Sequence, residues 1–321
     1  MDLWLIIVLI VVGLFLIFGV IPCFIMSYYL YRILLVRNSK EKWGRECSIP
    51  DDEEYRGMFD EGMAWDAEYS TNKKEVEIES EGFRLVGEYF DFGYEDAVII
   101  IAGRMESLLY DYYFAEPYRR AGLNVLVVDN RSHGNSEGRT NSLGQKEYKD
   151  IIAWARMLHD SLHVRKVILH GICIGSSTAL FALTDPDTPD YLAGMVAEGM
   201  YVTFHESFLN HMLVDHHPVF PFVMLVMMYI RLISGVDVVK DGPIYRIDRL
   251  KKPILFLHSR EDVFSLPTKA EELYNKCGSD KQIVWFDRGA HSRIRPNNKQ
   301  KYDDSIVQFC AAKGFGNSKL I

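Results

Sequence analysis

The 321-residue sequence predicts an α/β fold, a mostly parallel β-sheet with helices on both faces, preceded by a membrane-spanning helix. Three observations predict it. From residue 76 onward, short apolar runs rich in β-branched residues alternate with helical patterns, which is typical of a parallel sheet. The run AVIIIA at residues 97–102 is apolar throughout, as expected for a strand buried on both faces. Residues 3–26 contain no charged side chain, and about 20 such residues cross a bilayer as a helix.

The apolar segment at the start of the chain, residues 1–36, is interpreted as a retained transmembrane anchor. A cleaved signal peptide would carry basic residues before the apolar run and a small-residue cleavage site after it. Here only Asp2 precedes the run, and tyrosines at positions 28, 29 and 31 follow it as an interfacial aromatic belt would. Basic residues follow the span and none precedes it, so the positive-inside rule predicts a single-pass protein of the cell membrane with its body in the cytoplasm. These residues are Arg32, Arg37, Lys40, Lys42 and Arg45.

Composition narrows the classes of partner. The formal net charge of −8 and the absence of a basic stripe argue against nucleic-acid binding. The five cysteines form no CxxC pair, which favours free thiols in a reducing compartment over a disulfide framework. No motif for a metal or a cofactor is found, and we expect none. The sequence gives no expectation for the oligomeric state.

Four segments are predicted after the anchor. Residues 37–74 form a juxtamembrane helical linker, with an amphipathic helix over 53–69. Residues 75–200 and 248–321 form the two parts of the α/β core, and residues 201–247 insert a small helical cap, because that connection is longer than an ordinary loop. The predicted strands cover residues 76–78, 84–90, 97–102, 124–129, 166–169, 192–197, 253–258 and 282–286. The predicted core helices cover residues 110–121, 143–162, 176–183, 269–276 and 301–312.

The predicted cap contains an unusually apolar stretch at residues 218–230. It is too short for a second membrane span. We expect a buried or substrate-facing helix there, and a helix that re-enters or rests on the membrane is the alternative.

The stretch VILHGICIGSSTALF at residues 167–181 reads as strand, sharp turn and helix. In the motif G-x-S-x-G this strained turn exposes a nucleophilic serine, and glycines beside it make room for the turn. Here Gly171 and Gly175 flank Cys173. In such sheets the acid and then the histidine follow on loops after later strands. Asp262 follows the strand at 253–258 and His291 follows the strand at 282–286, which makes them the expected orienting acid and general base.

On these motifs, residues 75–313 resemble the α/β-hydrolase superfamily, within it the serine-aminopeptidase-like branch, and are similar to bacterial hydrolases with an amino-terminal membrane segment. Besides the strained turn around Cys173, the elbow, four further stretches carry the resemblance: DNRSHGNSEG at 129–138, the acid loop at 257–267, Gly289-Ala290-His291 and the final helix. The resemblance implies the α/β-hydrolase fold and a catalytic triad of Cys173, His291 and Asp262. It also implies an oxyanion hole formed by the backbone N–H groups of Ile174 and Arg104, with Met105 as the alternative to Arg104.

The sequence departs from the family pattern at three places. Ala102-Gly103 stands where the family has His-Gly, Ser132 replaces a glycine, and Cys173 replaces the serine. Three interpretations of the cysteine follow: a working thiol nucleophile, a small buried residue of a non-catalytic pseudohydrolase, or a redox switch. The first is favoured because both elbow glycines, the acid and the histidine stand where the family motif has them.

The sequence therefore predicts a membrane-anchored hydrolase that cleaves an acyl ester or thioester of a small-molecule substrate through a thioester acyl-enzyme, and the apolar cap favours a hydrophobic acyl group. Because amines and thiols attack thioesters readily, a cysteine-dependent acyltransferase is one alternative, and a binding module without activity is another. The remaining histidines are given structural or solvated roles: His133 holds its turn, His170 and His258 pack at sheet ends, and those of the cap bind no metal.

Overall fold

The structure, a computed structural model, describes residues 2–37 and 43–317. Its centre is one eight-stranded sheet in the order β1-β2-β4-β3-β5-β6-β7-β8. Strands β1, β2 and β4 pair antiparallel, and the strands from β4 through β3 to β8 pair parallel. The strands are β1 (Lys73–Ser80), β2 (Phe83–Phe90), β3 (Asp96–Ile101), β4 (Leu123–Val128), β5 (Val167–Ile172), β6 (Leu192–Glu198), β7 (Ile254–Ser259) and β8 (Lys281–Phe286). The predicted mostly parallel sheet is confirmed.

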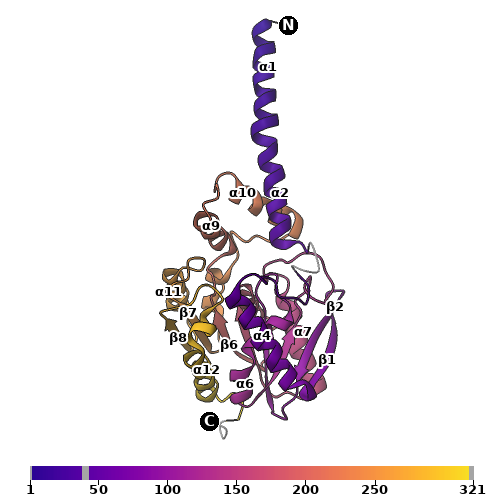
Figure 1. The fold of residues 1–321 in the computed structure, drawn as a ribbon, viewed down its shortest axis with the longest axis vertical. Coiled ribbons are helices and arrows are strands. Elements are labelled where there is room, and N and C mark those ends of the chain that lie inside the picture. The colour runs from indigo at the N-terminus through magenta and orange to yellow at the C-terminus, as the bar shows by residue number, and fades with distance from the viewer. Residues whose placement is uncertain (1, 38–42, 318–321) are drawn as a thin grey trace.

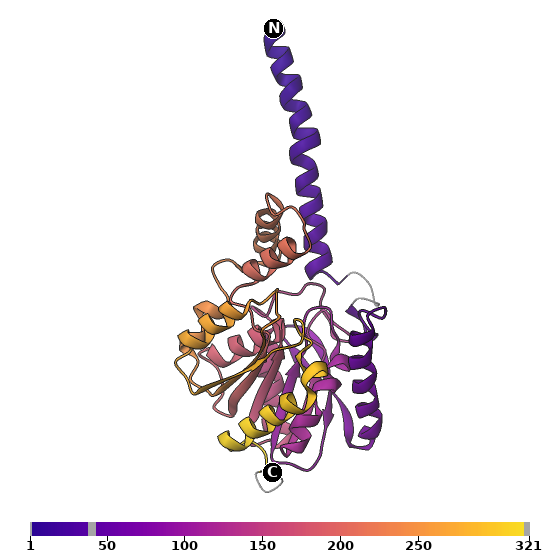
Figure 2. The ribbon, with the colours of Figure 1, turned by 60° about the vertical axis from the view of Figure 1, so that its left-hand side comes forward.

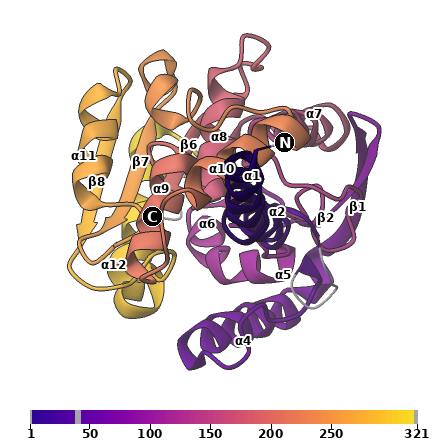
Figure 3. The ribbon, with the colours of Figure 1, turned by 90° about the horizontal axis from the view of Figure 1, so that it is seen from above.

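Helices cover both faces of this sheet (Figures 1 and 3). One face packs on α4 (Glu53–Glu68), α5 (Leu108–Asp111), α6 (Glu116–Arg120) and α12 (Ile294–Lys313). The other packs on α7 (Tyr148–Leu162), α8 (Ile174–Thr184) and α11 (Pro267–Lys276). Successive strand residues point to opposite faces, so Ile100 joins the first core and its neighbours Ile99 and Ile101 join the second. All three are fully buried, which explains why this strand is apolar throughout.

Three predicted helices differ from the structure. The helix predicted over 110–121 is broken into α5, a 3₁₀ turn at Tyr112–Phe114 and α6, because Pro117 lacks an N–H and can stand only in the first turn of a new helix. Helix α7 begins at Tyr148 instead of residue 143, since Leu143 and Gly144 have positive φ angles of 60° and 86°. Helix α12 begins at Ile294 and is kinked at Asn298, whose backbone is not helical.

The apolar amino-terminal segment is one long helix, built from α1 (Leu3–Phe15), a π-helical turn (Leu16–Val20) and α2 (Ile21–Leu35). The widened turn directly precedes Pro22, whose missing N–H would otherwise leave a carbonyl unpaired. Among the described residues this is the one helix long and apolar enough to cross a membrane, and its most apolar stretch is not buried against the protein. Figure 1 shows it rising away from the α/β domain past the cap.

Residues 43–72, which lead into the sheet, pack closely on the domain. Trp43 is fully buried with its ring 4.6 Å from that of His133, and Arg45 pairs with Asp129 at 3.1 Å. Helix α4 buries Tyr55 and three further residues of the same face: Met58, Gly62 and Trp65. Two of the basic residues used for the orientation, Lys40 and Lys42, lie outside the described residues.

The insertion between β6 and β7 forms a cap above the carboxyl ends of the strands (Figure 2). It contains α9 (Phe204–Val214), α10 (Phe222–Tyr229), a π-helical turn (Ile230–Ser234) and two 3₁₀ turns (Pro243–Tyr245 and Ile247–Arg249). Helix α10 packs directly on α2. Val226 and Ile230 of the cap share one apolar cluster with Tyr31 and Leu35 of the amino-terminal helix. The apolar stretch of the cap is therefore buried against α2 on one side.

Candidate active site

The cysteine lies in a strained turn between β5 and α8. Cys173 has φ 54° and ψ −110°, a conformation that L-residues rarely adopt. Both flanking glycines are sterically required: a Cβ on Gly171 would lie 2.2 Å from the carbonyl carbon of Gly175, and one on Gly175 would lie 2.0 Å from the carbonyl oxygen of Ile101. The Cys173 N–H donates to the Glu198 carbonyl at 2.9 Å. This is the geometry of a nucleophile elbow, with the thiol at the start of a helix.

The predicted acid and histidine lie side by side on the loops after β7 and β8. Oδ2 of Asp262 accepts a hydrogen bond from Nδ1 of His291 at 2.7 Å. Its other oxygen, Oδ1, accepts from the N–H groups of Phe264 and Ser265 at 2.9 and 2.8 Å, which fixes the carboxylate. Burial alone would raise the pKa of Asp262, but the charge and the hydrogen bond of His291 lower it below its usual value. The carboxylate therefore remains ionised and orients the imidazole.

The other nitrogen of this imidazole is available for chemistry. Nε2 of His291 is buried and has no nitrogen or oxygen partner in the described part of the chain; the ring interacts with the Cys173 side chain and lines the same cavity. Burial opposes protonation of the ring, but the charge of Asp262 and the contacts of the ring with the Asp262 and Cys173 side chains outweigh it and raise the pKa of His291 well above its usual value. The ring is thus a stronger proton acceptor than a free imidazole, with its accepting nitrogen on the side of the thiol.

Two backbone amides were predicted to bind an oxyanion. Ile174 begins α8, and the N–H groups of a first helical turn have no intrahelical acceptor. On the loop after β3, the Met105 N–H already donates to Nε2 of His133 at 3.3 Å. The Arg104 N–H makes no hydrogen bond to any residue of the described ranges. Arg104 is therefore the better placed of the two alternatives.

His133 holds this loop through both of its ring nitrogens. Nδ1 donates to the Arg131 carbonyl at 3.0 Å, which leaves Nε2 free to accept from Met105. Burial lowers the pKa of His133 to about 4, so the ring is neutral at physiological pH. The turn-holding role predicted for this histidine agrees with these contacts, which also reach the candidate oxyanion loop.

A second buried carboxyl group lines the same cavity as the thiol and was not predicted from the sequence. Oε1 of Glu106 accepts from the Tyr55 hydroxyl at 2.8 Å, and Oε2 accepts from the Gly103 N–H at 3.1 Å. Burial raises the pKa of Glu106 to about 7, although both hydrogen bonds oppose this. Its position three residues after Gly103 in the candidate oxyanion loop was the one available sequence signal. Nothing in the sequence linked it to Tyr55.

These groups surround a cavity of about 190 Å³ under the cap. His211 of α9 forms part of its wall and stacks on Phe264, with ring centroids 3.6 Å apart. Burial lowers the pKa of His211 to about 4, so this wall is uncharged; the expectation that the cap histidines are solvated is wrong for His211. The Arg104 side chain points to the carboxyl-terminal end of helix α2, where its Nη1 donates to the Leu34 carbonyl at 3.4 Å. The cavity is lined by Ser48, Ile49, Tyr55, Gly103, Arg104, Met105, Glu106, Tyr110, Cys173, His211, His291, Ser292 and Arg293.

The other two histidines at the sheet ends have polar partners. His258 Nε2 donates to the Ser265 carbonyl at 2.7 Å, close to Asp262. His170 is fully buried behind the elbow, with Nε2 3.2 Å from the Tyr302 hydroxyl, which in turn donates to Glu198. Burial lowers the pKa of His170 to about 3 and raises that of Glu198 to about 7. Both histidines support the loops of the candidate site instead of lining the cavity.

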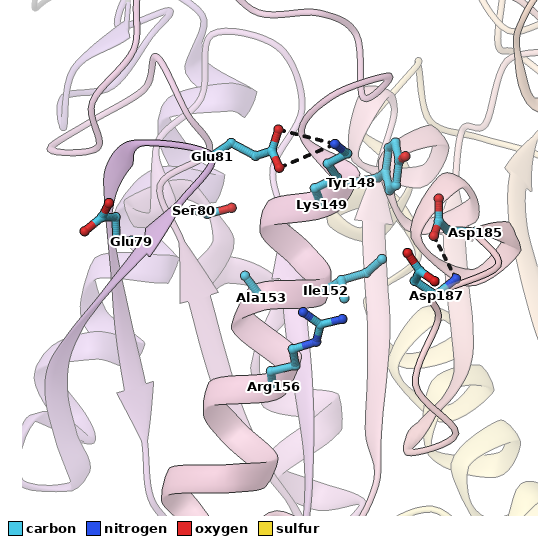
Figure 4. A pocket seen from close by; sticks show the side chains of 10 residues that line it. All are labelled: Glu79, Ser80, Glu81, Tyr148, Lys149, Ile152, Ala153, Arg156, Asp185 and Asp187. Atoms are coloured by element: carbon cyan, nitrogen blue, oxygen red, sulfur yellow. Dashed lines mark hydrogen bonds and ion pairs between the residues drawn. The ribbon is translucent and has the colours of Figure 1, made fainter.

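A larger hollow of about 390 Å³ lies on another part of the surface, between the β1–β2 hairpin and α7 (Figure 4). Some of its charged side chains are engaged with one another or with the backbone. Lys149 pairs with Glu81 at 3.3 Å, and Asp185 accepts from the Asp187 N–H at 2.9 Å. Ser80, which also lines this hollow, donates to Asp150 at 2.6 Å, and Asp150 is in turn paired with Arg131. Across the described ranges, no three metal-ligating side chains gather at one point.

Comparisons with known proteins agree with this fold. A family model described as alpha/beta hydrolase fold matches residues 96–220. The uncharacterized protein YqkD of Bacillus subtilis is 26% identical over 216 residues, which cover 67% of this chain and 70% of that protein.

Solved structures are similar over most of the chain. The esterase Pf2001 of Pyrococcus furiosus has a TM-score of 0.66 at 22% identity, covering 78% of this chain and 94% of that one. An alpha-beta hydrolase of Vibrio vulnificus has a TM-score of 0.62 at 18% identity, covering 88% and 93%. An acylaminoacyl peptidase of Pyrococcus horikoshii has a TM-score of 0.56 at 18% identity, covering 74% and 41%. The chain therefore has the α/β-hydrolase fold, as the sequence predicted.

Proposed function

We propose that this protein is a hydrolase of acyl esters or thioesters that uses Cys173 as its nucleophile. The single observation that carries the proposal is the state of His291. Its Nδ1 is fixed by Asp262 at 2.7 Å, while the buried ring interacts with the Cys173 side chain, with which it shares the cavity. A base held in one orientation, with its free nitrogen beside a thiol in a nucleophile elbow, is the arrangement that covalent acyl transfer requires.

In the first half-reaction, Nε2 of His291 takes the proton of the Cys173 thiol, and the sulfur attacks the carbonyl carbon of the substrate. The resulting oxyanion is stabilised by the N–H groups of Ile174 and Arg104. As the tetrahedral intermediate collapses, His291 returns the proton to the leaving alcohol or thiol. A thioester between the acyl group and Cys173 remains.

In the second half-reaction, His291 removes a proton from a water molecule, which attacks the thioester carbonyl through the same oxyanion site. The bond between carbon and sulfur breaks, the acid departs, and the proton returns to the sulfur. Asp262 keeps its charge throughout and stabilises the imidazolium that forms twice in each cycle.

The size of the cavity favours a small acyl group. Its volume of about 190 Å³ lies below the usual range for ligand pockets, about 300–1,000 Å³. An acyl group of a few carbon atoms suits it better than a long chain. The long apolar helix α1–α2 supports a membrane-anchored enzyme, and the basic residues after it support a cytoplasmic domain.

The test is intact-protein mass spectrometry of the full chain in detergent micelles after brief exposure to p-nitrophenyl acetate or butyrate. Wild type is compared with Cys173→Ala, His291→Ala and the control Cys47→Ala, since Cys47 is another partly exposed free thiol. We expect one acyl adduct in wild type and in Cys47→Ala, and none in the two site variants.

The rate at which the adduct is lost separates the alternatives. Loss in water alone supports a hydrolase, and loss only after an amine or thiol is added supports an acyltransferase. An adduct that persists in Cys173→Ala and disappears in Cys47→Ala would contradict the proposed nucleophile. A folded wild-type protein that forms no adduct with either ester would favour the non-catalytic pseudohydrolase.

A further inference from the structure

The cap exposes several large apolar side chains to the outside of the molecule. Outside α1 and α2, most of the exposed large apolar residues in the described ranges belong to this one insertion. Phe220 is 79% exposed and Leu232 is 71% exposed. We call the following set the cap face: Leu213, Val214, Phe220, Met224, Leu232 and Ile233. Soluble surfaces rarely gather apolar side chains in this way unless another surface covers them.

The cap contacts the amino-terminal helix near the position where the membrane-spanning part of that helix would end. The Tyr229 hydroxyl of α10 donates to the Phe24 carbonyl at 3.3 Å, and the Tyr31 hydroxyl of α2 lies 3.2 Å from that of Ser234. The ring of Tyr28 packs edge-on against Tyr229, with centroids 5.4 Å apart. These contacts hold the cap beside residues 24–31 of the helix, as Figures 1 and 2 show.

The length of the helix then places the cap relative to a bilayer. A helix rises about 1.5 Å per residue, so the stretch from Leu3 to Phe24 is about 33 Å long, close to the roughly 30 Å of a hydrocarbon core. Arg32 is the first charged residue after this stretch. The lower edge of a bilayer crossed by α1 therefore falls between the levels of residues 22 and 31, where the cap is attached. The cap must therefore lie at the interface between the bilayer and water.

The charges around the cap face suit the same partner. Residues 218–230 carry no charge at all. Next to Ile233, a hollow of about 330 Å³ is lined by Arg139 and Lys146, whose side chains are exposed. Basic side chains beside an apolar face are typical of surfaces that rest in the interface of a membrane with anionic lipids, and one acidic side chain, the exposed Asp215, follows Val214 of the same face.

From these observations we infer that the cap face docks into the interfacial layer of the bilayer that α1 crosses. The inference rests on the proposed membrane placement of α1 and is independent of the chemistry at Cys173. It makes the cap a second membrane contact and seats the cavity of the enzyme directly beneath the lipid surface. The partner is the lipid bilayer, and a second copy of the chain is the competing occupant of the same face.

The experiment is photo-crosslinking of the full chain reconstituted in vesicles of phosphatidylcholine and phosphatidylglycerol. Benzoylphenylalanine replaces, one at a time, Phe220 and Ile233 of the cap face. It also replaces Phe15 of α1 as the positive control, and Glu95 at the amino ends of the parallel strands as the negative control. Phe15 and Glu95 are both exposed in the structure. Intact-protein mass spectrometry then reads what each position has captured.

We expect a mass increase of one phospholipid at Phe220, Ile233 and Phe15, and none at Glu95. Lipid adducts at Phe15 alone would overturn the docking of the cap while leaving the anchor intact. A doubled protein mass from Phe220 or Ile233 would show that a second copy covers the face. Absence of a lipid adduct even at Phe15 would overturn the membrane placement of α1 and the docking with it. Acylation of Cys173 in the same samples reports separately on the chemistry.

Discussion

Replacing Glu106 by glutamine is expected to change how the stability of the protein depends on pH. Burial raises the pKa of this carboxyl from its usual 4.5 to about 7. The introduced glutamine keeps both contacts, because its oxygen accepts from the Gly103 N–H and its amide group donates to the Tyr55 hydroxyl, which is free to rotate. The variant therefore removes the titration with little change in packing.

The sign and the size follow from proton linkage. Between pH 4.5 and 7 the folded protein keeps a proton on Glu106 that the unfolded chain has released, so the free energy of unfolding falls as the pH rises. One pKa unit corresponds to about 1.4 kcal/mol, so the loss across this window is about 3 kcal/mol. Glu106→Gln lacks this loss and is expected to gain about that much stability relative to wild type on going from pH 4.5 to pH 8.

The assay is denaturant unfolding of the full chain in detergent micelles at pH 4.5, 6 and 8, for wild type, Glu106→Gln and the exposed control Glu271→Gln. The difference in the free energy of unfolding between Glu106→Gln and wild type should grow with pH, and the difference between Glu271→Gln and wild type should not. The raised pKa of Glu198 contributes to both proteins; burial is its largest cause and the charge of Glu106 the smallest of its named causes, so this contribution largely cancels in the comparison. An equal difference between wild type and Glu106→Gln at all three pH values would refute the reasoning, because it would mean that the carboxyl is solvated in the folded protein.

Three further substitutions test the site. Gly175→Ala places a Cβ 2.0 Å from a backbone carbonyl oxygen of β3, and we expect a loss of more than about 4 kcal/mol in denaturant unfolding; near-wild-type stability would show that the elbow is looser than its geometry implies. Asp262→Asn removes the charge that orients His291 and should slow acylation, followed by p-nitrophenolate release, by about 10⁴-fold; an unchanged rate would exclude Asp262 from the triad. His133→Phe leaves the Met105 N–H without its acceptor and should cost about 1–3 kcal/mol of stability, and a variant as stable as wild type would show that this contact is dispensable.

The local sequence pattern was sufficient for the sheet and for the order of the site residues. Strands such as β3 are apolar throughout because both of their faces are buried, so each can be recognised from one short run of apolar residues. Gly171 and Gly175 reveal the elbow because no larger residue fits there. Asp262 and His291 follow from it, since the carboxyl ends of parallel strands meet at one edge of the sheet.

The tertiary structure alone decided which groups surround the thiol. Tyr55 and Glu106 lie 51 residues apart, and their contact exists only because α4 packs beside the loop after β3. The Met105 N–H donates to His133, which lies 28 residues away in the sequence. The sequence around Arg104 and Met105 therefore could not show which of their two N–H groups is left without an acceptor. The seat of the cap on α2 joins residues more than 200 positions apart. Short-range sequence patterns indicate the backbone conformation and the burial of each residue. Contacts between distant segments depend instead on how complete helices and strands pack together, and a single sequence carries no periodic signal of this packing.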